Sequence, residues 1–258
     1  MPTERSPDLA AELALALELA DVADRLAMSR FRASDLTVRY KRDGSPVTDA
    51  DRLVEAALRE RLTQLRPEHT VIGEEAGASG AGEWRWYLDP IDGTTSFAAG
   101  RPGWSILIAL AKREDVIVGV ASSPTLQRRW WAARGHGTFR NGDRMRVSTT
   151  PLLRDATVND DSHGTLARGI GDHPLTRLAR ACGHVRPHRG HSFLAIAAGE
   201  GDVALGLGGE AWDYAPMKVI LEEAGGRFTD LTGADTISAG NALVSNGSLH
   251  AAALQALR

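Results

Sequence analysis

The segment Leu88-Asp89-Pro90-Ile91-Asp92-Gly93-Thr94-Thr95 places two acids in a turn directly after a run of strand-forming residues. Residues 84–88 read Trp-Arg-Trp-Tyr-Leu, a composition typical of a short β-strand. Pro90 fixes its own φ and lacks an N–H donor, so it interrupts the ladder of a sheet. Gly93 can adopt a positive φ, which permits a tight turn. The segment therefore predicts a strand that ends near Asp89 and is followed by an acidic turn.

The two acids of this turn are candidate ligands for a hard cation. Asp89 and Asp92 can point into one pocket, and the carbonyl of Ile91 between them is not committed to a sheet. Mg²⁺ prefers such oxygen ligands and keeps waters for chemistry. Two ions about 3.5–4 Å apart can activate a water and stabilise the leaving oxygen of a phosphate ester. The turn therefore indicates a magnesium site.

Further acids lie beside turn residues elsewhere in the chain. Gly73-Glu74-Glu75 follows a strand expected at residues 70–72, and Asp213 lies just before an expected helix. Asp51 belongs to a Thr-Asp-Ala-Asp sequence that is typical of a capping box. Each acid has a structural alternative when it is taken alone, because acids often cap helices and turns. Taken together, and at strand ends, they favour a metal site.

The composition excludes several classes of protein. The chain has 258 residues, enough for one large domain or two intimate halves with a sizeable core. Its formal net charge of −3 argues against a nucleic-acid partner. Its single cysteine, Cys182, excludes an internal disulfide and fits a reducing compartment. No uncharged apolar run reaches the length of a membrane span, so we expect no membrane partner and a cytoplasmic location.

The hydrophobic pattern divides the chain near residue 150. Residues 1–150 are predicted to form an α+β half, with two helices followed by an antiparallel sheet and most of the metal ligands. Residues 151–258 alternate between strand and helix patterns, so they are predicted to form an α/β half that carries Asp213 and the substrate wall. The last helix of this half is expected from about Tyr214 to Gly225.

These motifs resemble the inositol-monophosphatase family of metal-dependent phosphatases, and the resemblance covers nearly the whole chain. It rests on Pro46-Val47-Thr48 leading to Asp51, Gly73-Glu74-Glu75, the segment Asp89 to Phe97, Trp212-Asp213 and Glu223-Ala224-Gly225-Gly226. The segment Asp89 to Phe97 is highly specific. The resemblance implies an α/β fold, namely the layered α-β-α-β-α sandwich of the inositol-monophosphatase and fructose-bisphosphatase type. It also implies a homodimer.

The resemblance further implies a set of metal ligands. Glu74, Asp89 and the carbonyl of Ile91 would bind one Mg²⁺ ion. Asp89, Asp92 and Asp213 would bind a second, and Glu74 would help to hold a third, weaker one. Mn²⁺ can substitute for Mg²⁺ in this expectation, and Li⁺ should inhibit by competing for one site.

The catalytic roles are likewise implied by the resemblance. Thr94 would hydrogen-bond the attacking water, and Asp51 would accept a hydrogen bond from Thr94, so Asp51, Thr94 and Glu74 are the candidate catalytic residues. Gly93, Thr94 and Thr95 would present N–H groups and hydroxyls to the phosphate at a helix start. The reaction would be a direct attack by a metal-activated water, without a covalent intermediate.

Residues 126–135 look like the histidinol-phosphatases of actinobacteria, but the C-terminal half, which carries the substrate wall, departs from that pattern. Gly206 and His191 stand where such relatives usually carry acids. The candidate substrate-binding residues are Asp92, Gly93, Thr94, Thr95, Arg189, His191, Glu210 and Asp213. The basic stretch from His184 to His191 predicts either a solvated edge or a pocket for a neutral sugar or a second anionic group.

Several functions therefore stay open. Histidinol phosphate is the first single candidate among small phosphate monoesters. The alternatives are inositol phosphate or another sugar phosphate, and a nucleotide or sugar bisphosphate. An alternative of another class is a catalytically weak, phosphatase-like regulatory binding protein. All the acids expected at the metal site are present, which favours catalysis.

Overall fold

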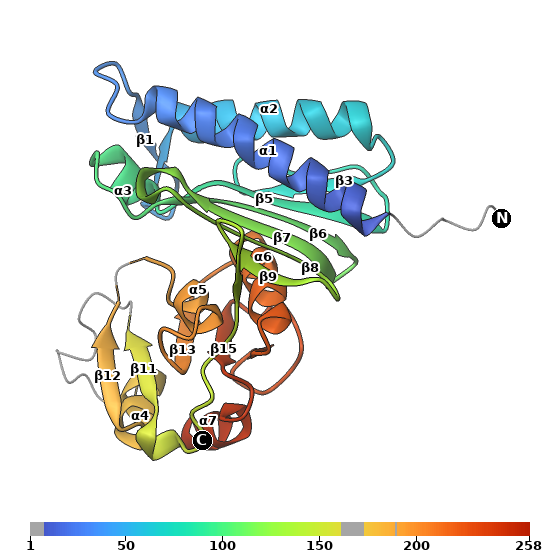
Figure 1. Ribbon diagram of the computed structural model, residues 1–258. Helices are drawn as coiled ribbons and strands as arrows, with labels where there is room; N and C mark the ends of the chain where they lie inside the picture. The colour runs from blue at the N-terminus through green and yellow to red at the C-terminus, as the bar shows by residue number, and fades with distance from the viewer. Residues whose placement is uncertain (1–7, 161–172, 189) are drawn as a thin grey trace.

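The computed structural model describes residues 8–160, 173–188 and 190–258. The chain is arranged in alternating layers of helices and sheets, α-β-α-β-α, from the top of Figure 1 to the bottom. This is the layered sandwich that the resemblance implied. No helix in the described ranges is long and apolar enough to cross a membrane.

The helices are α1 (Leu9–Arg30), α2 (Asp49–Leu65), α3 (Thr94–Ala98), α4 (Pro174–Ala181), α5 (Ser192–Ala197), α6 (Ala211–Glu223) and α7 (His250–Ala256), with 3-10 turns η1 (Pro124–Leu126) and η2 (Leu153–Asp155). The first strands are β1 (Val38–Tyr40), β2 (Pro46–Thr48), β3 (Thr70–Gly73), β4 (Gly77–Ser79), β5 (Trp84–Asp92), β6 (Ser105–Lys112) and β7 (Asp115–Ser123). The remaining strands are β8 (Arg128–Ala133), β9 (Gly137–Arg140), β10 (Asp143–Met145), β11 (Thr157–Asp160), β12 (His184–Pro187), β13 (Val203–Leu207), β14 (Arg227–Thr229) and β15 (Asn241–Ser245).

The larger sheet has eight strands in the order β10-β9-β8-β7-β6-β5-β3-β4. From β10 to β5 its neighbours are antiparallel, as expected, but β3 and β5 run parallel. The expectation of a fully antiparallel sheet is therefore wrong at this pair. The reason is that β3 turns back into the edge strand β4, so that β5 joins the other side of β3 in the original direction.

Both faces of the larger sheet are buried. Helices α1 and α2 cover one face, where Leu19 and Leu58 pack against alternate sheet residues such as Ile106. Helices α5 and α6 cover the other face, where Leu107 and Ile220 belong to one apolar cluster. Successive side chains of a strand point to opposite faces of the sheet. A sheet with helices packed on both faces therefore needs apolar residues at nearly every position of its strands. Strands β6 and β7 meet this need, because almost all their residues are buried.

The smaller sheet has five strands in the order β12-β11-β13-β15-β14. Its strands β11, β12 and β13 are parallel, and β14 and β15 are antiparallel to their neighbours. Helices α5 and α6 lie on one face, and α4 and α7 pack on the other through an apolar cluster that includes Leu178 and Ala253. The apolar cluster around α5 and α6 thus contains residues from both predicted halves. The division near residue 150 stays a prediction.

Candidate active site

The acidic turn lies at the end of β5, but the strand does not stop at Asp89 as predicted. It continues to Asp92, and its pairing with β6 shifts register between these two residues. The Oδ1 atom of Asp89 accepts a hydrogen bond from the N–H of Ile91 at 3.0 Å, which holds the bulge. Gly93 then turns the chain at φ +87°, and a Cβ there would lie 3.0 Å from the Gly103 carbonyl oxygen. A side chain at position 93 would therefore distort the turn that presents both acids.

Asp213 enters the site from α6. The helix begins at Ala211, so Asp213 lies inside its first turn and does not precede the helix as predicted. Its Oδ2 atom accepts a hydrogen bond from the backbone N–H of Glu210 at 2.7 Å, in the manner of a capping box. This contact fixes the orientation of a side chain that also reaches Asp89.

Asp89, Asp92 and Asp213 form the acid cluster. Each offers a carboxylate oxygen within 4.8 Å of the others. Burial raises the pKa of Asp89 well above its usual range, and the charges of Asp92 and Glu74 raise it further. Burial and the charge of Asp92 raise the pKa of Asp213 to about 6. Carboxylates brought together out of water repel one another unless a cation or a proton separates them, so this set of donors fits a hard divalent ion.

Glu74 lies beside the acid cluster but is turned to a cation of the chain itself. It follows β3, and its backbone N–H donates to the carbonyl of Leu88 at 3.2 Å. Its Oε1 atom accepts a hydrogen bond from Lys41 Nζ at 2.7 Å, and Lys41 also contacts Glu75 at 2.7 Å. Burial lowers the pKa of Lys41, but the hydrogen bonds to the two glutamates outweigh it and raise the pKa. Lys41 thus supplies positive charge at a carboxylate that we predicted to hold a metal ion.

Glu55 on α2, like Lys41, is a residue of the site that sequence reasoning missed. Only 1% of it is exposed, and its carboxylate accepts hydrogen bonds from the N–H groups of Glu75 at 2.7 Å and Ala76 at 3.0 Å. Arg59 donates to the same carboxylate at 2.7 Å. A Cβ on Gly73 would lie 2.4 Å from Glu55 Oε1, so the glycine is needed for this approach. Glu55 therefore holds the two backbone N–H groups that directly follow Glu74, and its carboxylate lies against Gly73 before it.

The predicted contact between Thr94 and Asp51 is present. Thr94 Oγ1 donates to Asp51 Oδ1 at 3.2 Å and to the Ile91 carbonyl at 2.9 Å. Asp51 is buried, and its Oδ2 accepts from both the N–H and the hydroxyl of Thr48, which completes a capping box for α2. Burial raises the pKa of Asp51, although the hydrogen bonds from Thr48 and Thr94 oppose this effect. Asp51 is therefore both a helix cap and a partner of the candidate water-binding hydroxyl.

The structure brings part of the predicted substrate wall to the cluster. His191 Nε2 lies 3.1 Å from Asp92 Oδ2, although the two residues are far apart in the sequence. Thr94 and Thr95 occupy the first turn of α3, where N–H groups have no partner within the helix. Glu210 contributes its backbone N–H to Asp213, and Arg189 lies outside the described residues.

The packing around Gly206 leaves no room for an acid at this position of the predicted substrate wall. A Cβ at this position would lie 2.9 Å from both Phe193 Cζ and Tyr214 Cε1. The two rings stack with centroids 6.2 Å apart, so they fill the space that an acid at position 206 would need. The rings of Phe193 and Tyr214 therefore occupy the space beside Gly206, and no gap is left in the wall.

Comparison with known proteins places this geometry in context. The sequence model described as "Inositol monophosphatase family" matches residues 8–258. The chain is 42% identical to a histidinol-phosphatase of Mycobacterium tuberculosis, over 93% of this chain and 95% of that protein. It is 40% identical to a histidinol-phosphatase of Streptomyces coelicolor, over 95% and 96%. A solved inositol monophosphatase from Zymomonas mobilis superposes with a TM-score of 0.81 at 29% identity, over 98% and 99% of the two chains.

Proposed function

Since this chain belongs to the inositol monophosphatase family of metal-dependent phosphatases, we propose that it uses Mg²⁺ to hydrolyse a small-molecule phosphate monoester, with histidinol phosphate as the first candidate. The chain is a phosphoric monoester hydrolase, like its relatives. The observation that carries the proposal is the acid cluster of Asp89, Asp92 and Asp213, next to the contact between Thr94 and Asp51.

The proposed ligands are the acid cluster, Glu74 and the Ile91 carbonyl. Mg²⁺, when bound, supplies positive charge that acidifies a water and offsets the charge on the leaving oxygen. Two features of the chain support this assignment: the carboxylates of the cluster lie close together, so that their charges raise the pKa of Asp89, and Lys41 already places a positive charge beside Glu74. Because Mg²⁺ would compete with Lys41 for Glu74, binding should shift Lys41 towards Glu75.

Thr94 is positioned to hold the attacking water. Its single hydroxyl proton is shared between Asp51 Oδ1 and the Ile91 carbonyl. The lone pairs of Thr94 Oγ1 therefore remain available to accept a hydrogen bond from water. Asp51 fixes this orientation because its other oxygen is tied to Thr48. The N–H groups of Thr94 and Thr95 lie in the first turn of α3 and have no partner within the helix, and we propose that they contact the phosphate.

The candidate substrates fall into two groups. Identities of 40–42% to proteins named histidinol-phosphatases, over more than nine-tenths of the chain, support histidinol phosphate. The absence of an acid at Gly206 and the imidazole of His191 beside Asp92 support an inositol or other sugar phosphate, or a bisphosphate. A cationic amine gains from a nearby carboxylate, and these two positions do not provide one.

The test is phosphate release from histidinol phosphate, inositol 1-phosphate and glycerol 2-phosphate, whose alcohol part is small and uncharged, each with Mg²⁺, with Mn²⁺ and with excess chelator. We expect hydrolysis of at least one ester with either metal ion and none after chelation. Full activity in exhaustively chelated buffer would contradict the metal proposal. Absence of hydrolysis with every ester would instead support the regulatory binding protein. The cytoplasmic location and the homodimer stay predictions, the latter to be checked by light scattering.

A further inference from the structure

The 208–210 loop, made of Gly208, Gly209 and Glu210, joins β13 to α6. Gly208 and Glu210 are exposed, so the loop has little packing of its own. The N–H of Gly209 donates to the hydroxyl of Tyr214 at 3.1 Å, and the next N–H, that of Glu210, donates to Asp213 Oδ2 at 2.7 Å. Two neighbouring residues of α6 thus hold two neighbouring N–H groups of the loop, and one of the two residues is an acid of the cluster.

The ring of Tyr214 packs against two glycines of the same segment. A Cβ on Gly206 would lie 2.9 Å from Tyr214 Cε1, and a Cβ on Gly209 would lie 2.6 Å from Tyr214 Cζ. Phe193 stacks on the ring and Phe228 meets it edge-on, at centroid distances of 6.2 and 5.9 Å. Only 5% of Tyr214 is exposed, so the hydroxyl is carried to the loop by a ring that its neighbours hold in place.

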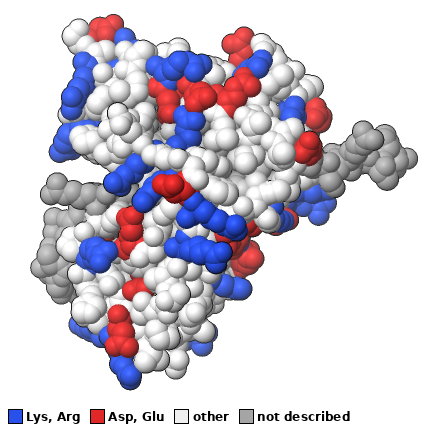
Figure 2. All heavy atoms as spheres, in the orientation of Figure 1, with Lys and Arg blue, Asp and Glu red and all other residues white. Residues whose placement is uncertain are grey.

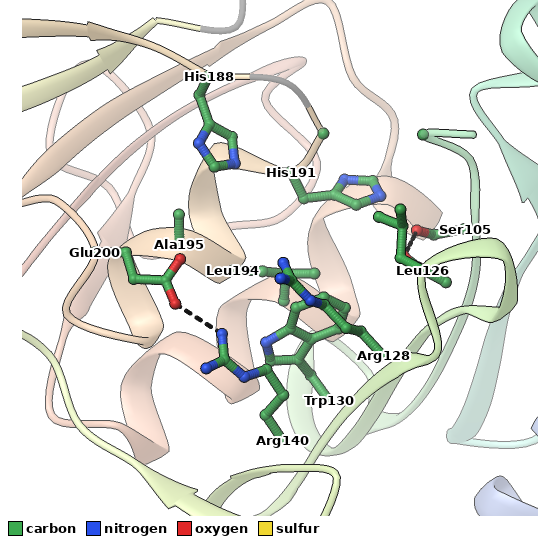
Figure 3. A pocket seen from close by; sticks show the side chains of 13 residues that line it. Ser105, Leu126, Arg128, Trp130, Arg140, His188, His191, Leu194, Ala195 and Glu200 are labelled. Carbon is green, nitrogen blue, oxygen red and sulfur yellow. Dashed lines mark hydrogen bonds and ion pairs between the residues drawn. The ribbon is translucent and has the colours of Figure 1, made fainter. Parts of the chain in front are cut away.

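Tyr214 lies away from the pocket that opens beside the acid cluster. This pocket encloses about 470 Å³, and His191 and Leu194 line it (Figure 3). Phe193, between them in the sequence, instead stacks on Tyr214. Among the described residues, the lining of the pocket does not include Tyr214. A role for Tyr214 in the reaction therefore acts through other residues and not by contact with a substrate.

We propose that Tyr214 is a positioning residue, whose hydroxyl holds the 208–210 loop in the place from which Glu210 fixes Asp213 for Mg²⁺. This inference rests on the proposed function, because Mg²⁺ is the ion proposed at the acid cluster. Groups that hold a metal ligand by a hydrogen bond typically change metal affinity by about 10–100-fold. Glu210 is such a group, and Tyr214 acts one step further away, so its effect should be smaller. The hydroxyl carries this role, because phenylalanine would supply the same ring.

The test is Tyr214→Phe, which removes the hydroxyl and keeps the ring between Phe193 and Phe228. We expect calorimetry to show Mg²⁺ binding weakened by roughly three- to tenfold, less than for a group bonded directly to a ligand. The Mg²⁺ concentration for half-maximal activity should rise by the same factor, whereas kcat at saturating Mg²⁺ and KM for the ester should stay within about twofold. The substitution introduces no charge, so it leaves unchanged the field of the Lys and Arg side chains that Figure 2 shows along the boundary between the two halves of the molecule.

Two further measurements separate positioning from a loss of stability. Phe228→Leu, the matched control, removes a buried ring contact of Tyr214 but keeps the hydroxyl, so it should lower the unfolding temperature and leave Mg²⁺ affinity unchanged. Amide exchange, measured by NMR in the metal-free protein, should be faster in Tyr214→Phe at Glu210 as well as at Gly209, because both N–H groups depend on the position of the loop. In Phe228→Leu, exchange at Glu210 should stay as in wild type.

The outcomes separate this inference from the proposed function. Unchanged Mg²⁺ affinity in Tyr214→Phe, or an equal loss of affinity in Phe228→Leu, would overturn the positioning role while phosphatase activity stands. If wild type binds no Mg²⁺, the proposed function fails, and amide exchange still decides whether Tyr214 positions Asp213. Faster exchange at both Gly209 and Glu210 would then support the inference. Faster exchange at Gly209 alone would refute it, because Glu210 would remain bonded to Asp213 without the hydroxyl.

Discussion

Glu55 and Asp89 are both buried carboxylates near the turn that carries Glu74, but their neighbours carry opposite charges. Glu55 is surrounded by donors: two backbone N–H groups and the guanidinium of Arg59. Asp89 is surrounded mainly by other acids, and burial together with the charge of Asp92 raises its pKa. Burial of a charge is costly unless a partner compensates it. The comparison teaches that the chain supplies the partner of Glu55 itself, whereas we propose that a cation from solution is the partner of Asp89.

The strongest test of this difference is Asp89→Asn. Activity should fall to the residual level of the chelated enzyme, because a central ligand is lost while the hydrogen bond to the Ile91 N–H is kept. In chelator at pH 8 the same variant should unfold at a higher temperature than wild type, because charge repulsion within the acid cluster is relieved. A lower unfolding temperature would mean that Asp89 is a structural acid like Glu55.

The substitution Asp51→Asn tests an acid that shares features with both Glu55 and Asp89. Asp51 is hydrogen-bonded like Glu55, yet it lies at the candidate water site like Asp89. Loss of its charge should lower kcat by roughly 10²–10⁴-fold, the usual contribution of a group that orients or deprotonates a nucleophile. The affinity for Mg²⁺, measured by calorimetry, should change little. An Asp51→Asn enzyme with the kcat of wild type would leave Asp51 as a helix cap only.

Glu55→Gln should show the opposite stability effect from Asp89→Asn. The half-buried guanidinium of Arg59 loses a charged acceptor, so the unfolding temperature should fall in the presence and absence of Mg²⁺. The turn that carries Glu74 should loosen and weaken Mg²⁺ binding by roughly 10–100-fold, as for residues that support a metal ligand. Glu60→Gln on the exposed side of α2 is the matched control. Equal effects of the two substitutions would show that Glu55 has no special role.

The smallest expected effect is a pH dependence of stability in the metal-free protein. The pKa of Asp213 is raised to about 6 in the folded state, above its usual value of 3.8. The folded state therefore binds this proton more tightly than the unfolded state, so acidification through pH 6 stabilises the protein and neutral pH destabilises it. Between pH 8 and pH 6 the unfolding temperature should rise by about 2–4 °C for each kcal/mol gained.

Two comparisons isolate the contribution of Asp213 from other titrations. Asp213→Asn should reduce the rise in unfolding temperature between pH 8 and pH 6, because the titrating group is gone. Mg²⁺ should raise the unfolding temperature of wild type more at pH 8 than at pH 5, because it must compete with protons at the lower pH. A wild-type protein with the reverse pH trend, unchanged by Asp213→Asn, would show that the acids of the cluster do not repel one another.

The sequence alone identified the acids of the cluster because each one lies in a short motif at a strand or helix end. Asp89 and Asp92 are three residues apart, so the turn itself indicates that they converge. Glu55 and Lys41 were missed because their contacts are not local: Glu55 meets a backbone N–H 20 residues away, and Lys41 meets Glu74 33 residues away. No short pattern encodes such contacts, since they depend on how α2 and the β1–β2 loop pack against the turn.

Sheet architecture shows the same limit. Trp130 and Trp131 are neighbours on β8, yet they pack against different apolar clusters on the two faces of the larger sheet. Which partner covers each face depends on helices far away in the sequence. Strands β14 and β15 and helix α7 were not predicted either. β14 has only three residues, and its strand conformation follows from pairing with β15.

The position of α6 between the sheets has a consequence for how the protein is made. Chains emerge from the ribosome from the N-terminus, at about 5–20 residues per second. The strands that end at Ser123 are complete well before Ile220 and its neighbours exist to cover their second face. During that interval an apolar surface and an incomplete set of acids are exposed together. Arrival of α6 then covers the surface and delivers Asp213 in one event, so the nascent chain should become competent for metal binding and resistant to aggregation at the same moment.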